Sequence, residues 1–293
     1  MHALRQTLVI ILSLLLFGAL KLHYEDNLSE TMVEQRLLQP KLSSETRLEV
    51  GQISAAAMLG GMRSLIASIW NLRAYYHFEN LDWLELEKNY ELITTLQPHT
   101  TSYWTTGAWH LHTNASTYYT ENEELSPIRQ RSMRRLYINK GSDFLEEGVR
   151  QNPDDWKLHL ALAELWSNPY REPDIPRAIK HYENVLKSEY IPDYARPTRE
   201  RFYFYILTRS PEHSQQAYKL GKELYYKSKA HHRPNFSCCL FALQNKLQIT
   251  ADERINDSDL FPSNQLKRKW LNDYWKNQNK GYPMNGVKSS LTL

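Results

Sequence analysis

Large and small apolar residues recur along the chain with a period of 34 residues. The pattern is carried by Trp70, Ala74 and His77, and then by Trp104, Ala108 and Leu111. Spacings of three and four residues place the members of each group on one face of a helix. A fixed period of this size indicates a stack of repeated supersecondary units. We therefore expect an all-α chain whose helices pack in successive pairs.

A second apolar pattern follows the first in each unit and ends near a proline. Its members are Leu86, Tyr90, Ile93 and Pro98, then Gly141, Leu145, Gly148 and Pro153, and then Ala178, Tyr182, Val185 and Pro192. The third unit begins with His159, Leu162, Ala163 and Trp166. A fourth unit, residues 195–230, keeps Ala217 but has Gly221 where an aromatic residue is expected. Small residues in these positions let neighbouring helices approach closely.

These residues resemble the tetratricopeptide repeat superfamily. Bacterial membrane-anchored members of unassigned function are similar in the stretches 59–70, 96–98, 104–109 and 147–153. The resemblance covers roughly residues 55–230 and implies a right-handed solenoid of antiparallel helix pairs. It also implies that the chain holds peptides or partner domains in a concave groove. It implies nothing about chemistry.

The second unit contains an insertion. Ala108 and Gly141 lie 33 positions apart, where the repeat spacing would give about 12. Ser126 followed by Pro127 is typical of a helix start, so we expect helices over 101–119 and 127–151. The result would be a long hairpin, inserted near 112–135, with an acidic tip at 121–124. Such an insertion is either a binding element or a tolerated loop.

The N-terminal region carries an apolar run, residues 7–20, that begins behind Arg5. A membrane span needs about 20 residues, and Lys21 and Tyr24 extend the usable length to residues 7–24. We expect an uncleaved anchor over residues 1–24, with a cleaved signal peptide as the alternative.

The charges around this run predict its orientation. Arg5 precedes it, and Glu25, Asp26 and Glu30 follow it, so the bulk of the chain should cross the membrane. In a bacterium this places one pass in the inner membrane and the rest in the periplasm. Residues 25–51 read as a linker. The segment 52–70 is either a second span or the first helix of the body, and Arg63 within it favours the helix.

The C-terminal region should close the helical body. Apolar residues recur at helical spacing in 235–249 and 263–278, so we expect capping helices within 231–278 and a mobile tail over 279–293. Ser263 can cap the second helix, whose aromatic stripe faces either the core or a partner or membrane surface.

The sequence offers no recognisable catalytic chemistry. The 36 basic and 33 acidic residues are interspersed, which does not favour nucleic-acid binding. Cys238 and Cys239 lie in an apolar run and read as buried thiols. His110 and His112 point in different directions on a helix and cannot share a metal ion. We expect no enzyme activity, no cofactor and no metal site.

The function that remains is protein binding. We expect a scaffold subunit of an envelope complex for transport, secretion or the cell surface, which binds the membrane through residues 7–24. The candidate partner-binding residues are Tyr103, Trp109, Glu123, Glu124, Arg131, Arg134 and Arg135. The alternative is an exported enzyme or a polysaccharide- or peptide-binding protein that uses Tyr103, Trp104, Trp109 and Trp166. The sequence identifies neither the partner, the pathway nor the oligomeric state.

Overall fold

A computed structural model describes residues 28, 30–35 and 62–279 of the 293-residue chain. The predicted anchor over 7–24, most of the linker and the tail after Asn279 lie outside these residues. Over residues 62–279 the chain is all-helical and forms no strand, as the apolar spacing predicts. Across the described residues no helix combines the length and the apolarity that a membrane crossing requires. The chain divides into two compact units, residues 1–98 and 99–293, each of which is described by itself.

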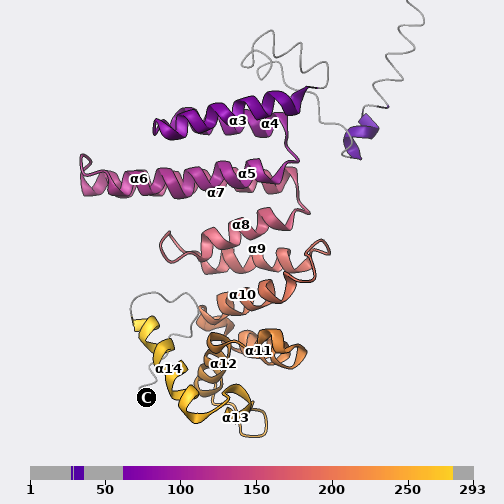
Figure 1. Cartoon of the computed structure of the whole chain (residues 1–293), viewed down its shortest axis with the longest axis vertical. Coiled ribbons are helices and arrows are strands. Elements are labelled where there is room, and N and C mark those ends of the chain that lie inside the picture. The colour runs from indigo at the N-terminus through magenta and orange to yellow at the C-terminus, as the bar shows by residue number, and fades with distance from the viewer. Residues whose placement is uncertain (1–27, 29, 36–61, 280–293) are drawn as a thin grey trace, which may run out of the picture. The chain divides into compact units, whose positions relative to one another are not determined.

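In the first unit, residues 62–98 form a helical hairpin of α3 (Arg63–Glu79) and α4 (Trp83–Leu96) (Figure 1). Asp82 caps α4, because its side chain accepts a hydrogen bond from the Glu85 backbone N–H at 3.3 Å. The faces that meet are those of the 34-residue pattern, and their buried members are Ala74, His77, Leu86, Tyr90 and Ile93. Trp70, at the start of that pattern, is only half-buried.

The second unit begins with the long hairpin that the insertion predicts. Its first arm runs through α5 (Thr101–Trp109), the π-helical turn η1 (His110–Ala115) and α6 (Ser116–Glu121). Its second arm is α7 (Pro127–Gln151), with the predicted bounds. Ser126 caps α7 as expected, since its hydroxyl accepts from the Arg129 N–H.

Four shorter helices follow the long hairpin. They are α8 (Trp156–Ser167), α9 (Ile175–Lys187), α10 (Arg196–Thr208) and α11 (Ser214–Lys227). Gly221 of α11 stands at the position of the fourth unit where the repeat pattern predicts an aromatic residue, and the packing shows why none fits there. A Cβ at this position would lie 2.5 Å from the Phe204 ring and 2.7 Å from Leu240. The aromatic ring is therefore supplied by α10, and α11 provides the space for it.

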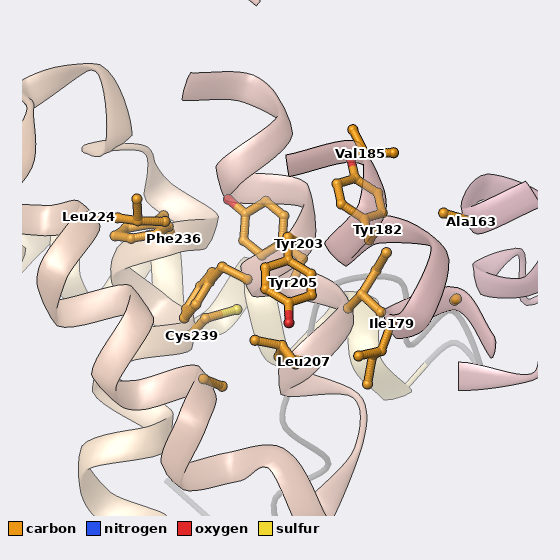
Figure 2. Close-up of a cluster of buried hydrophobic side chains, with 14 of the residues drawn as sticks. Ala163, Ile179, Tyr182, Val185, Tyr203, Tyr205, Leu207, Leu224, Phe236 and Cys239 are labelled. Carbon is orange, nitrogen blue, oxygen red and sulfur yellow. The ribbon is translucent and has the colours of Figure 1, made fainter. Parts of the chain in front are cut away.

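Aromatic and aliphatic side chains from α8 to α12 form one continuous core (Figure 2). Tyr182 stacks on Tyr203 with ring centroids 5.9 Å apart, and Phe204 packs on Phe236 at 4.6 Å. Offset and tilted ring pairs of this kind add to the free energy of apolar burial. The many aromatic residues of this region therefore fill the interior.

The chain continues through α12 (Pro234–Lys246), the short α13 (Asp257–Leu260) and α14 (Asn264–Asn279). Ser263 caps α14, because its hydroxyl accepts from the Leu266 N–H at 3.2 Å. Leu271 and Tyr274 are buried, so the aromatic stripe of α14 faces the core. Cys238 and Cys239 are buried free thiols, as predicted, and burial raises the pKa of each to about 12.

Candidate functional site

An open groove of about 630 Å³ lies between the first helices of two successive hairpins in the second unit. One wall is formed by Thr105, Thr106, Trp109, His112 and Thr113 of α5 and η1. The other is formed by Lys157, Leu160, Ala161, Glu164 and Leu165 of α8. Asn168 and Arg171, in the loop after α8, complete the lining. The lining is mixed: four of its twelve residues, Trp109, Leu160, Ala161 and Leu165, are apolar and the others are polar or charged.

The π-helical turn η1 places His112 and Thr113 in the groove. The wide turn frees backbone carbonyls, and Ser116 donates its hydroxyl to the His112 carbonyl at 2.7 Å. Gly141 of α7 approaches His112 very closely. A Cβ there would lie 2.7 Å from the His112 Cβ. Because π-turns are rare and recur at functional sites, this one marks the groove as a candidate binding surface.

Arg171 is a half-buried cation in the lining of the groove. Its Nη1 donates to the Ser116 hydroxyl at 3.0 Å, which is a neutral acceptor. Burial, and then the nearby charge of Arg134, lower the pKa of Arg171. Among the residues that the structure describes, no ion pair joins Arg171 to a carboxylate. A half-buried guanidinium without a carboxylate partner is costly, so this part of the groove favours an anionic group.

His112 is a neutral imidazole beside this cation. Its Nδ1 lies 2.9 Å from the Thr113 hydroxyl. Burial, and secondarily the charge of Arg171, lower the pKa of His112 to about 4. Near neutral pH the ring therefore adds no charge to the groove, and it offers one donor and one acceptor.

Of the candidate partner-binding residues predicted from the sequence, the structure brings Trp109 to the groove, where its side chain is 48% exposed. Tyr103 is half-buried on α5 and does not line the groove. Glu123 and Glu124 are exposed at the hairpin tip, and Arg131 is exposed on α7. These four residues do not share one site with Trp109.

The last two candidates, Arg134 and Arg135, bind the chain itself. Arg135 pairs with Glu172, with Nε 2.9 Å from Oε2, and Arg134 donates to the Tyr170 carbonyl. Both contacts connect α7 to the loop between α8 and α9. This loop therefore rests on the long hairpin, and beyond it the hairpin extends by α6 and the first turns of α7.

Two of the aromatic residues considered for a sugar-binding surface are interior residues. Trp104 is 4% exposed and packs on Phe144, with ring centroids 4.9 Å apart. Trp166 is 6% exposed, and the Arg177 guanidinium covers its ring at 3.9 Å. Neither ring can stack on a ligand, so Trp109 is the member of that set that lines the groove.

A second polar cluster joins α8 to α9. His159 Nδ1 lies 3.2 Å from His181 Nδ1, and His159 Nε2 lies 3.3 Å from the Pro153 carbonyl. An N–H at Nε2 leaves Nδ1 of His159 as the acceptor for His181. Burial is the main cause that lowers the pKa of both rings, to about 4 for His181. Both rings are therefore neutral at pH 7.

Sequence analysis considered His112 only as a metal ligand, and it did not predict that a groove would be lined by His112, Thr113, Lys157, Glu164, Asn168 and Arg171. Helical spacing identifies which face of a helix is buried, but the groove depends on the close approach of α5 and α8. Among the described residues no group of three or more His, Cys, Asp or Glu side chains is arranged to hold a metal ion. No protein-family model, no curated protein and no solved structure matches this chain.

Proposed function

We propose that this protein is a non-catalytic scaffold that binds an extended segment of a partner protein in the groove between α5, η1 and α8. The observation that carries the proposal is the open, mixed lining around the exposed Trp109. Trp is among the residues that contribute most to protein interfaces, and grooves along stacked helices suit extended ligands.

The charge of Arg171 indicates which chemical groups the bound segment carries. Within the described part of the chain Arg171 has a neutral hydroxyl partner and no carboxylate partner, so an acidic side chain or a C-terminal carboxylate of the segment would complete its hydrogen bonds. Trp109 would contact an apolar or aromatic residue of the same segment. The ligand is therefore a short peptide with one apolar and one acidic anchor.

The hairpins are those of a tetratricopeptide-type solenoid in this proposal. Support comes from the buried positions of the 34-residue pattern, among them Ala108, Ala163 and Ala178, which are fully buried. The proposal includes anchoring in a bacterial inner membrane through residues 7–24, with the helical body in the periplasm. Its support is the apolar run and the charges on either side of it.

Co-purification from detergent-solubilised native membranes tests this function. Trp109→Ala and Arg171→Gln should each reduce the recovery of a stoichiometric partner at least tenfold, because loss of an interface anchor costs about 2 kcal/mol or more. Tyr194→Ala is the matched control, since Tyr194 is 86% exposed and lies outside the groove. Equal recovery with all three variants would refute the groove as the binding surface.

A further inference from the structure

The two walls of the groove run side by side in the same direction, and two hydrogen bonds set their register. Thr101, the first residue of α5, donates its hydroxyl to the carboxylate of Asp155, which caps α8. Further along both walls, Arg171 donates to the Ser116 hydroxyl at 3.0 Å. Thr101 and Ser116 are 15 residues apart, and Asp155 and Arg171 are 16 residues apart. The walls therefore advance nearly in step, and a ligand that lies along the groove meets both.

The α8 wall presents its charges in a fixed order. Lys157 and Glu164 both line the groove, and both are exposed. They are seven residues apart, which is two helical turns, so they lie on one face of α8 about 10.5 Å apart along its axis. The apolar residues Leu160 and Ala161 lie between them. Arg171 follows Glu164, so the groove carries a cation, an anion and a second cation along its length.

Both charges on α8 can still bind a ligand. The Lys157 ammonium lies 5.9 Å from the centroid of the Trp156 ring, and among the described residues no carboxylate forms an ion pair with it. Glu164 Oε1 lies 3.6 Å from Nη1 of Arg199 on α10. This ion pair is longer than a hydrogen bond, so the Glu164 carboxylate keeps its capacity to accept one. A ligand with the complementary charges would gain two charge-assisted hydrogen bonds on this wall.

We propose that the groove selects a segment with an acidic residue and a basic residue three positions apart, which pair with Lys157 and Glu164 respectively. This inference rests on the proposed function and adds the order of charges to it. A polyproline-II segment completes a turn every three residues and rises about 3.1 Å per residue, so residues three apart share one side and lie about 9.3 Å apart. In a β-strand, residues three apart face opposite sides. The separation of the two α8 charges therefore fits the polyproline-II conformation.

The order of the charges determines which segments the groove accepts. A segment with the two charges exchanged would place its acidic residue beside Glu164 and its basic residue beside Lys157, and contact between like charges opposes binding. Arg171 takes the acidic anchor of the proposed function, so the preferred segment carries a second acidic residue beyond the basic one. The apolar contact with Trp109 does not depend on this order. The charges of α8 and the Trp109 ring can therefore be tested separately.

Exchange of the two charges in the full chain tests the proposal by co-purification from native membranes. Lys157→Glu combined with Glu164→Lys keeps the net charge and reverses the order. We expect at least tenfold lower recovery of the partner that the parent chain recovers. The matched control is Glu212→Lys combined with Lys219→Glu, an exposed pair with the same separation that lies outside the groove. It should keep the parental recovery, and circular dichroism melting of both exchanged chains should match that of the parent.

Exchange of the charges in the ligand is the second measurement, and it distinguishes lost recognition from a weakened fold. Twelve-residue peptides that tile the sequence of the recovered partner are titrated with the full chain in detergent, with fluorescence anisotropy as the readout. We expect the peptide that binds most tightly to contain an acidic and a basic residue three positions apart. Exchange of these two residues should weaken its binding to the parent chain at least tenfold. The exchanged peptide should bind the chain with Lys157→Glu and Glu164→Lys more tightly than the original peptide does.

The other outcomes overturn the order of charges, and they separate it from the proposed function. A partner that is lost with Trp109→Ala but retained by the chain with exchanged charges would overturn the order of charges and leave the proposed function standing. If the parent chain recovers no partner, both are overturned. A tightest peptide without the charge pair, or an exchanged peptide that gains no affinity for the exchanged chain, would also overturn the order of charges.

Discussion

Single residues set the distance between helices in this molecule. A Cβ on Gly141 would lie 2.7 Å from the His112 Cβ and 2.9 Å from the His112 backbone nitrogen. A Cβ on Gly148 would lie 3.0 Å from the Trp104 ring. The contacts at Gly141 are the shorter ones and include backbone atoms, which adjust less easily than the Trp104 side chain beside Gly148, so the two glycines tolerate substitution differently.

We predict that Gly141→Ala destabilises the protein by about 1–2 kcal/mol, because overpacking outweighs the gain of about 1 kcal/mol in helix propensity. Gly148→Ala should change the unfolding free energy by less than about 1 kcal/mol. Urea denaturation followed by circular dichroism measures both. Greater destabilisation by Gly148→Ala than by Gly141→Ala would contradict the packing described here.

The histidine pair between α8 and α9 makes stability depend on pH. Burial, and then His159, Arg177 and Lys180, lower the pKa of His181 from 6.5 to about 4. Between these values the unfolded chain binds a proton that the folded chain does not bind. The contribution of neutral His181 to the unfolding free energy is therefore complete above about pH 6.5, and it is lost as the pH falls toward 4.

We predict that the unfolding free energy decreases between pH 7 and pH 5, and that His181→Gln reduces this decrease. Glutamine keeps a donor for His159 but does not titrate. Lys187→Gln on the same helix is the control and should keep the full pH dependence. Denaturant titrations at several pH values measure the unfolding free energy. The same dependence on pH for the parent chain and for His181→Gln would contradict the prediction.

At the scale of elements, the π-helical turn η1 accommodates an extra residue in the first arm of the long hairpin, and the arm therefore stays continuous. A π-turn usually contains one residue more than an α-helical turn. The faces of α5 and α6 both remain against α7 across this turn, with Ala108, Leu111 and Ala115 buried.

We predict that deletion of Asn114 is tolerated, because it converts η1 to an α-helix and leaves α5 and α6 facing α7. Deletion of Thr105, in regular α-helix, should rotate all following side chains by about 100° and cost several kcal/mol. Thermal melting compares the two deletions. Equal loss of stability would show that η1 is not an insertion of one residue.

Elements with strong local signals could be predicted from the sequence. The bounds of α7 follow from Ser126 and Pro127 at its start, and α14 follows from Ser263. The π-turn η1 and the short α13 could not be predicted, since both depend on neighbours distant in sequence. Gly141 contacts η1 from α7, and Gln244 of α12 bonds both backbone groups of Ile255 just before α13. The groove was missed for the same reason, because Arg171 reaches Ser116 across 55 residues.

At the scale of the whole molecule, the groove of the second unit is the surface on which the proposed function depends. The tip residues Glu123 and Glu124 are exposed, whereas Arg134 and Arg135 are engaged within the chain. The proposed binding function therefore rests on Trp109 and Arg171, of which only Trp109 was among the candidate residues predicted from the sequence.

The central claim is that a partner lies in the groove, and photo-cross-linking from position 109 tests it most directly. p-Benzoylphenylalanine replaces Trp109 in the full chain, and the native cells are irradiated. The account predicts one discrete adduct heavier than the chain, which disappears with Arg171→Gln, and no such adduct from the same probe at Tyr194. No adduct from position 109, or the same adducts from both positions, would contradict it.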